Sequence, residues 1–285
     1  MINGRDVFDP KGEEHYRGPH AINMHFCKNI TLKGYKIVDS ANWAHAITRS
    51  ENITFSNLEV LDGHDALHVR NCKNVLIENC RLVTGDDCVA GFGNLDVVVK
   101  NCEISSLCSA FRFGGRNILV EDCNIFLHTK PGKDERHNRL NMLSFFTYFA
   151  MDDLPPLAEP GNIVIRNSKI NGPDKLLHLN LSGNETWQRG TPPTDITFEN
   201  IVATNIPNSL CAYGVEGEPL NITFKNFDYS YCEGFENTPF MLGAHITELR
   251  FDNTVIKGFK GNALIKAWSD ISFDAKGLDC GVNDD

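Results

Sequence analysis

Short stretches in which apolar and polar residues alternate recur along the chain at nearly even intervals. The four residues from Asn52 to Phe55, NITF, are one example. Alternation with a period of two, rich in Val, Ile, Phe and Thr, is typical of β-strands, and no stretch keeps a helical period for long. The chain is therefore expected to consist of short strands joined by turns.

The alternating stretches are copies of one unit of about 22 residues. The first five copies begin at Asn29, Asn52, Asn74, Asp96 and Asn117, so their spacings are 23, 22, 22 and 21 residues. Five later copies begin at Asn162, Asp195, Asn221, Glu248 and Asp270. Short strands and tight turns at this period are typical of a parallel β-helix, in which each coil pairs with the next. A leucine-rich repeat has a similar period, but its LxxLxLxxN pattern is missing.

The repeat also places residues of one kind at one position on successive coils. Cys80, Cys102 and Cys123 each lie six residues after the start of their unit. Because buried cysteine packs as a small apolar residue, we expect the 10 cysteines to be reduced and largely stacked. We expect the Asn at the start of each unit to hydrogen-bond the turn backbones of neighbouring coils.

Two longer segments interrupt the repeat. Residues 126–161 are predicted to form an irregular insertion within a single β-helix domain that spans residues 1–285, and a second insertion contains GNETWQRGTPP. Insertions in a solenoid usually lie on one face, which is often the binding face. The first 20 residues are expected either to cap the first coil or to follow N-terminal coils that this chain lacks, because an open solenoid end exposes strand edges.

Composition and charge narrow the possible functions. The chain has 27 Lys and Arg against 37 Asp and Glu, a net charge of −10, which argues against a nucleic-acid partner. No apolar run is long enough to span a membrane, and the N-terminal residues do not resemble a signal peptide. We expect a monomer that is cytoplasmic if the chain start is genuine, and secreted or periplasmic otherwise.

Three acidic residues stand out because the repeat fixes their relative positions. Asp65 lies nine residues before Asn74, and Asp87 lies nine residues before Asp96, so the two occupy the same position on adjacent coils, with Asp86 beside Asp87. Carboxylates one strand spacing apart raise each other's pKa, and such clusters are where acid and base roles separate. A solvated turn or a calcium site of oxygen ligands remains the alternative.

The runs DGHDALHV and TGDDCVA, preceded by INGRDVFDPKGEEHYRGP, resemble glycoside hydrolase family 28, the polygalacturonase and rhamnogalacturonase group. The resemblance implies a right-handed parallel β-helix that hydrolyses pectic polysaccharides with inversion and needs no cofactor. Family motifs are NTD, a DD pair one coil later, GHG and RIK. By this resemblance Asp65 matches the Asp of NTD, Asp86 would be the general acid, and Asp65 and Asp87 would hold and activate the attacking water.

The sequence departs from the family pattern at several motif positions. Gly63 and His64 replace the Asn and Thr of NTD, the GHG position falls near Ser109, and the RIK stretch is at best Arg139-Leu140-Asn141. Loss of the family's Lys makes plain polygalacturonate a doubtful substrate, so we expect a neutral or differently decorated sugar in the cleavage subsite.

Six further residues are candidates for substrate binding. Trp43 lies one coil before Asp65 at the same position and is either a sugar-stacking platform or a partly buried core residue. His64 is expected to stack against Asp86, and Arg112 aligns with Ile47 and Val69 or, shifted by one residue, with Arg70. His68, within a strand, is interpreted as structural. The binding set is Trp43, His45, His64, Arg112, Arg139 and Trp187.

The sequence therefore predicts a glycosidase that acts on pectic or related polysaccharides or oligosaccharides without a metal. A calcium-dependent lyase or epimerase and a non-catalytic, tailspike-like carbohydrate-binding solenoid remain the alternatives.

Overall fold

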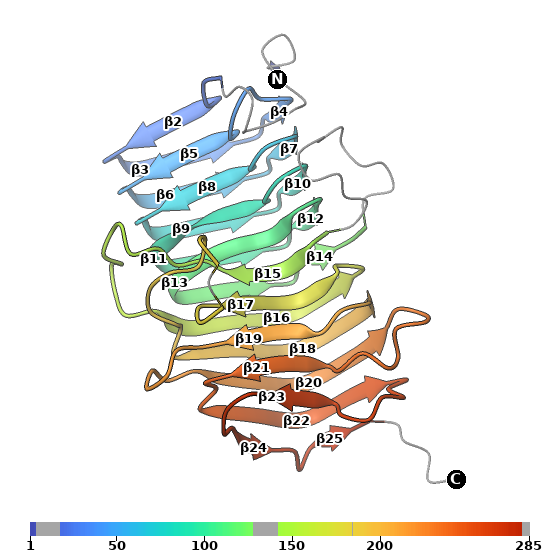
Figure 1. Cartoon of the computed structure of the whole chain (residues 1–285). Helices are drawn as coiled ribbons and strands as arrows, with labels where there is room; N and C mark the ends of the chain where they lie inside the picture. Colours follow the sequence, from blue (N-terminus) through green and yellow to red (C-terminus); the bar gives the residue numbers. More distant parts are fainter. Residues whose placement is uncertain (4–17, 128–141, 184, 281–285) are drawn as a thin grey trace.

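The computed structural model describes residues 1–3, 18–127, 142–183 and 185–280. Within these ranges the chain forms 25 strands and no helix, and neighbouring coils pair in parallel along their length (Figure 1). The predicted all-β fold, a right-handed parallel β-helix, is confirmed. The described residues accordingly contain no helix that could cross a membrane.

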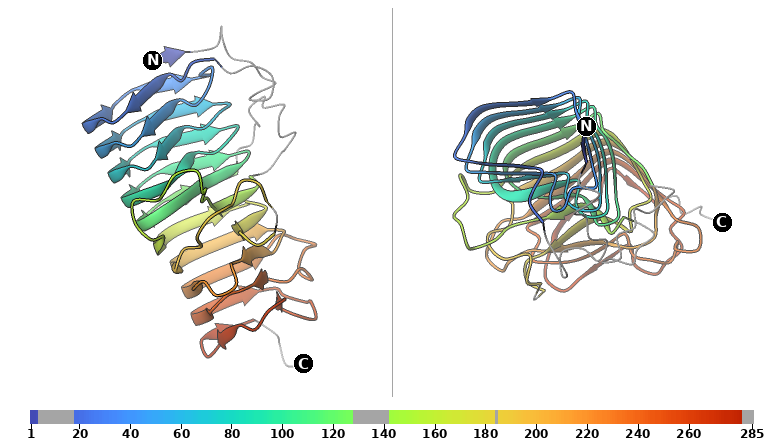
Figure 2. Two further views of the ribbon diagram at one scale, coloured as in Figure 1. Left: turned by 60° about the vertical axis from the view of Figure 1, so that its left-hand side comes forward. Right: turned by 90° about the horizontal axis from the view of Figure 1, so that it is seen from above.

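Each coil contributes to three parallel stacks of strands, which enclose one long core when seen along the axis (Figure 2). The first stack consists of β2 (Ile22–His25), β5 (His45–Thr48), β8 (Leu67–Arg70), the beginnings of β11 (Val89–Lys100) and β13 (Ser109–Glu121), β15 (Ser144–Tyr148), β17 (Lys175–Asn180), β19 (Leu210–Tyr213), β21 (Met241–Ala244) and β23 (Ile265–Ala267).

The other two stacks share several long strands that bend between them. The second stack consists of β3 (Lys28–Lys33), β6 (Glu51–Ser56), β9 (Lys73–Glu78), the ends of β11 and β13, the beginnings of β16 (Gly161–Asn171), β18 (Asp195–Ile206), β20 (Asn221–Tyr231) and β22 (Glu248–Lys257), and β24 (Ser272–Asp274). The third consists of β1 (Ile2–Asn3), β4 (Lys36–Val38), β7 (Glu59–Asp62), β10 (Arg81–Thr84), β12 (Glu103–Ser106), β14 (Asn124–Ile125), the ends of β16, β18, β20 and β22, and β25 (Leu278–Asp279).

Like residues stack inside the coils, as the repeat predicts. The rings of Phe198 and Phe224 have centroids 5.3 Å apart, and those of Phe224 and Phe251 are also 5.3 Å apart. Cys80, Cys102 and Cys123 are buried at equivalent positions on successive coils, each with its thiol donating to the carbonyl oxygen two residues earlier, and all ten cysteines are free thiols. The predicted cysteine stack is therefore confirmed.

The asparagines of the turns form ladders that only partly match the expectation. Asn221 Nδ2 donates to the Thr194 carbonyl oxygen of the preceding coil at 3.1 Å, as expected, but other side chains bond to each other: Asn52 Nδ2 donates to Asn29 Oδ1 at 2.9 Å, and Asn74 Nδ2 donates to Asn52 Oδ1 at 2.9 Å. Asn29, Asn52 and Asn74 have φ near 56°, in the left-handed region that Asn tolerates better than most residues. A coil spacing of about 4.8 Å lets successive amides meet directly.

One irregularity alters the register of the first stack. Between Gly91 and Asn94 of β11 two residues stand opposite one residue of β13, so the coil that follows is one residue shorter. Gly91 is required at this bulge, because its φ is 128° and a Cβ atom there would lie 1.6 Å from the carbonyl oxygen of Val69.

The described part of the segment predicted as an irregular insertion contains β15, which continues the first stack between β13 and β17. After β15 the chain leaves the coil as a loop, residues 149–160, and crosses back over earlier coils. Asn71 Nδ2 donates to the carbonyl oxygen of Pro155 at 2.7 Å, and the Leu157 amide donates to that of Gly93 at 3.2 Å.

Candidate active site

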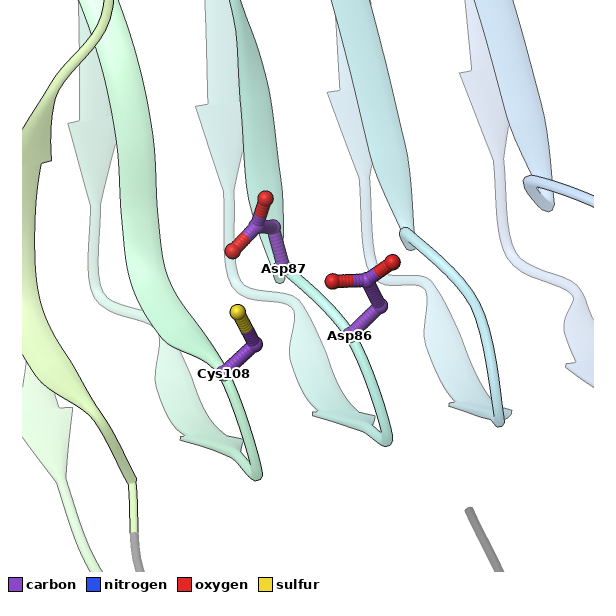
Figure 3. Close-up of side chains that lie close together, drawn as sticks. All are labelled: Asp86, Asp87 and Cys108. Carbon is purple, nitrogen blue, oxygen red and sulfur yellow. The ribbon is translucent and has the colours of Figure 1, made fainter. Parts of the chain in front are cut away.

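The three acidic residues lie at the turns that lead from the third stack into the first. Asp65 precedes β8, and Asp86 and Asp87 precede β11. Pairing of Leu67 with Val89 places Asp65 and Asp87 at equivalent positions on adjacent coils. Figure 3 shows Asp86 and Asp87 projecting from one turn, with Cys108 on the corresponding turn of the next coil.

Backbone amides hold two of these carboxylates in a column. The Asp87 amide donates to Asp65 Oδ1 at 3.2 Å, and the Ser109 amide donates to Asp87 Oδ1 at 3.1 Å. The carbonyl oxygen of Asp86 accepts hydrogen bonds from Thr84 Oγ1 and Ser106 Oγ, each at 2.6 Å. The turn that carries Asp86 and Asp87 is therefore fixed by contacts with its own coil and the next one.

The column carboxylates of Asp65 and Asp87 are buried, whereas that of Asp86 is partly exposed. Asp65 is 3% exposed and Asp87 is 1% exposed, while Asp86 is half-buried. Burial, and then the neighbouring Asp86 and Asp87 charges, raise the pKa of Asp65 well above its usual range. Burial and the Asp86 charge raise the pKa of Asp87 to about 6, although Arg112 acts in the opposite direction.

A histidine that the sequence did not mark as functional contacts this column. His68 Nδ1 lies 2.9 Å from Asp65 Oδ2, and the imidazole is 7% exposed. Burial, followed by the charges of Arg112 and Arg70, lowers the pKa of His68 to about 3, so the ring is neutral. The interpretation of His68 as a purely structural residue therefore does not match its place beside the carboxylates.

Trp43 lies at the position that the repeat predicts, but it cannot be an open stacking platform. Its ring stacks on His68 from the following coil, with centroids 3.7 Å apart and planes at 5°. His20, from the preceding coil, stacks on it at 5.1 Å and 22°. Since Trp43 lies between two imidazoles, its faces are not available to a sugar ring.

Arg112 lies on the first stack next to the carboxylates, in a register that differs from both expected alignments. It pairs with Ala90, and Ala90 pairs with His68, because the bulge in β11 shortens the coil. Arg112 Nη1 lies 3.7 Å from Asp87 Oδ2, and the guanidinium packs over the Phe149 ring at 3.9 Å. The structure thus places a partly exposed cation at the carboxylate cluster.

The described part of the second insertion, residues 181–183 and 185–191, also reaches this cation, and we call it the strap. Its Trp187 is 62% exposed, and the ring centroid lies 5.6 Å from the Arg112 guanidinium carbon. Glu185 anchors the strap: its Oε1 lies 2.9 Å from His178 Nε2 and accepts from Asn180 Nδ2 at 3.0 Å. The Arg189 amide donates to the Ala150 carbonyl oxygen at 2.9 Å, so the strap contacts loop 149–160, and both line a cavity of about 200 Å³.

Three predicted binding residues are not supported by their positions. His45 is fully buried in the core, where its Nε2 meets the Tyr35 hydroxyl at 2.6 Å and its Nδ1 meets the Ala66 carbonyl at 2.8 Å. His64 occupies the position on its coil that Asp86 has on the next, but it is 1% exposed and so does not reach substrate directly. Arg139 lies outside the described residues.

Two residues at the site, His68 and Phe149, were not predicted to be functional, and the sequence marks only the first of them. His68 aligns with the exposed-face position of Arg112, which an exact register would have revealed. The sequence pattern around Phe149 gives no sign that its ring carries Arg112, because that contact depends on the path of the chain after β15.

One group of possible metal ligands lies at this site, formed by one atom each of Asp86, Asp87 and Cys108. These atoms lie within 4.8 Å of one another. Calcium prefers six to eight oxygen ligands, and a thiol does not suit that ion. The donor set therefore does not fit the calcium site of the lyase alternative.

Comparison with known proteins shows what the chain is similar to. The family model of glycosyl hydrolases family 28 matches residues 3–107. An exopolygalacturonase of Arabidopsis thaliana is 25% identical over 267 residues, covering 80% of this chain and 58% of that protein. A probable polygalacturonase of the same plant is 27% identical over 107 residues, covering 36% of this chain and 22% of its own length.

The chain thus spans less than two thirds of the length of these relatives. The fold is also that of a solved structure, a hyperthermoactive exopolygalacturonase from Thermotoga maritima, with a TM-score of 0.53, 16% identity and coverage of 87% of this chain and 53% of the other. With the family motif residues placed as described above, residues 3–107 of the chain are thus similar to glycosyl hydrolases family 28, at low identity to its members.

Proposed function

We propose that this protein hydrolyses glycosidic bonds in pectic or related polysaccharides or oligosaccharides by acid and base catalysis. The observation that carries the proposal is the carboxylate column, with Asp65 and Asp87 buried and fixed by amides and Asp86 partly open beside them. Burying two acids this deeply is unfavourable for folding, so a functional reason for the arrangement is expected.

In the proposed reaction Asp86 is the general acid, because it is the carboxyl that solvent and substrate can reach. It gives its proton to the glycosidic oxygen as the bond from that oxygen to the anomeric carbon breaks. A water molecule held by Asp87 and Asp65 forms the new bond to the anomeric carbon and gives a proton to the Asp87 carboxylate. Proton exchange with solvent then restores both groups.

The stereochemical outcome forms part of the proposal. The family resemblance implies inversion, whereas Asp86 and Asp87 have ligand atoms within 4.8 Å, closer than the roughly 6.5–9.5 Å usual between the carboxyl groups of inverting enzymes. We propose inversion with the water placed between Asp65 and Asp87. Proton NMR of the first anomer released tests this directly.

Arg112 and Trp187 are the proposed substrate contacts. The guanidinium is 24% exposed and offers charge and planar donors beside Asp87, and Trp187 provides an exposed aromatic face next to it. The expected loss of a cation with the RIK lysine is therefore offset by Arg112, and acidic pectic sugars join neutral ones as proposed substrates. We further propose that the protein acts as a monomer with no nucleic-acid partner.

The decisive experiment compares the wild-type protein with Asp86→Asn on pectic oligosaccharides, some rich in uronate and some containing rhamnose. Reducing ends should be released by the wild type and fall on the order of 10²-fold or more in the variant. Asp96→Asn is the matched control, because Asp96 occupies a ladder position that other coils fill with Asn, and it should behave as wild type.

The same assay separates the alternatives. Products with the ultraviolet absorbance of an unsaturated sugar, lost on chelation, would indicate the lyase. Binding without turnover, unchanged in Asp86→Asn, would indicate a carbohydrate-binding solenoid and would overturn the proposal.

A further inference from the structure

The hydrogen bond between His68 and Asp65 is buried, and both side chains are held in place by further contacts. Asp65 Oδ2 and His68 Nδ1 are 2.9 Å apart, and both side chains are nearly inaccessible, at 4% and 9% exposure. Asp65 Oδ1 is occupied separately by the Asp87 amide at 3.2 Å. Each oxygen of this carboxyl therefore has its own partner, and the carboxyl plane is fixed.

The ring of His68 is held as tightly as the carboxyl. Trp43 stacks on it at 3.7 Å with the planes only 5° apart, and His20 covers Trp43 from the preceding coil. This three-ring stack prevents the imidazole from turning away from Asp65. A histidine that only filled space in the wall would not need its Nδ1 aimed at a catalytic candidate.

The charged groups around His68 influence whether the proton in its hydrogen bond to Asp65 lies on the imidazole or on the carboxyl. His20, Asp65, Arg70, Asp86 and Arg112 all act on His68. The imidazole is neutral, so the single proton between Nδ1 and Oδ2 belongs either to the ring or to the carboxyl. A proton on Nδ1 stabilises the ionised form of Asp65, whereas burial and the neighbouring Asp86 and Asp87 charges oppose that ionised form.

We infer that His68 is a positioning residue: it donates its Nδ1 proton to Asp65 Oδ2 and so keeps that carboxyl oriented and ionised beside the attacking water. The inference rests on the proposed function for the role of Asp65. The proton arrangement itself can be measured without any turnover, so the two ideas can fail separately.

The first test reads the tautomer. In protein labelled with ¹⁵N-histidine, the His68 signals, assigned by their loss in His68→Asn, should show a protonated Nδ1 and an unprotonated Nε2 near neutral pH. Free neutral histidine does not impose this choice, because either nitrogen can carry the proton. Protonation at Nε2 throughout the pH range would mean that Asp65 holds the proton, and would overturn the inference even if the enzyme is active.

The second test reads the pH dependence of hydrolysis. His68→Leu removes the donor, so the acidic limb of the kcat profile should move up by about one pH unit or more. His68→Asn, whose Nδ2 takes the place of the Nδ1 donor, should keep the limb near that of the wild type. Where His68→Leu does not fold, His68→Gln serves instead, because its longer side chain carries the amide past the Nδ1 position.

Exposed His25 provides the control, and His25→Asn should leave the profile unchanged. A purely structural His68 would lower stability and kcat without moving the limb, and equal profiles for the Leu and Asn variants would therefore refute the positioning role. If the wild type released no sugar, the proposed function would fail and the tautomer measurement alone would decide this inference.

Discussion

Asp87 donates its backbone amide to the Oδ1 atom of Asp65 on the preceding coil, at 3.2 Å. This bond links the Asp65 carboxyl to the coil that carries Asp86 and Asp87. In the same way, the Ser109 amide of the following coil donates to Asp87 Oδ1. Because a coil spacing of about 4.8 Å brings each carboxyl to the following amide, the solenoid itself builds the column. The position of one acid therefore cannot change without moving the other.

The buried Asp87 carboxyl should make the protein less stable as the pH rises. Its pKa is raised from 3.8 to about 6, chiefly by burial, so the folded protein binds this proton more tightly than the unfolded chain. The contribution to stability is complete below about pH 4 and is lost as the pH rises through about 6. Asp87→Asn should therefore unfold at a higher temperature than the wild type near pH 7 and at a similar one near pH 4.

Thermal unfolding of both proteins across this pH range checks the expectation, with Asp96→Asn as the control for loss of a more accessible carboxylate. A wild type that becomes more stable between about pH 4 and 7, with Asp87→Asn following the same curve, would contradict it.

The sequence was sufficient to predict what depends on the repeat. The first five units have nearly the same length, so the equal offsets of Asp65 and Asp87 from their unit starts correctly aligned them on adjacent coils. The cysteine stack followed from the same arithmetic. His45, by contrast, was predicted to bind substrate, although it aligns with Leu67 on the next coil, at a position that repeats as apolar.

Features that depart locally from the repeat could not be predicted from the sequence. The bulge between Gly91 and Asn94 shifts Arg112 into line with Ala90 and His68, and no composition rule marks where a bulge falls. The strap and loop 149–160 leave the coils altogether, and their contacts with Arg112 depend on a chain path that periodicity does not determine.

Arg112 should set the pH at which the proposed base becomes active. Its charge lowers the pKa of Asp87, against the larger effects of burial and Asp86. Arg112→Ala should raise that pKa further, so the acidic limb of kcat/KM should move to higher pH and activity near pH 5 should fall by a factor on the order of 10. Arg112→Lys keeps the charge and should move the limb less.

The pH profiles of the three proteins on one oligosaccharide decide the matter. Because a lysine loses the planar packing on Phe149, its KM should still rise. Identical acidic limbs in wild type and Arg112→Ala would show that the cation does not act on the base.

Trp187 should contribute to substrate binding rather than to the chemical step. Its ring is 62% exposed and lies next to Arg112. Loss of an aromatic face that stacks on a sugar removes binding in both ground state and transition state, so Trp187→Ala should raise KM by about 3- to 30-fold and leave kcat nearly unchanged. Trp268 is equally exposed, at 64%, on a coil far from the carboxylates, and Trp268→Ala should keep the wild-type KM. Equal KM values for the two variants would place the substrate away from the strap, whereas a fall in kcat for Trp187→Ala alone would mean that the strap orders the catalytic groups.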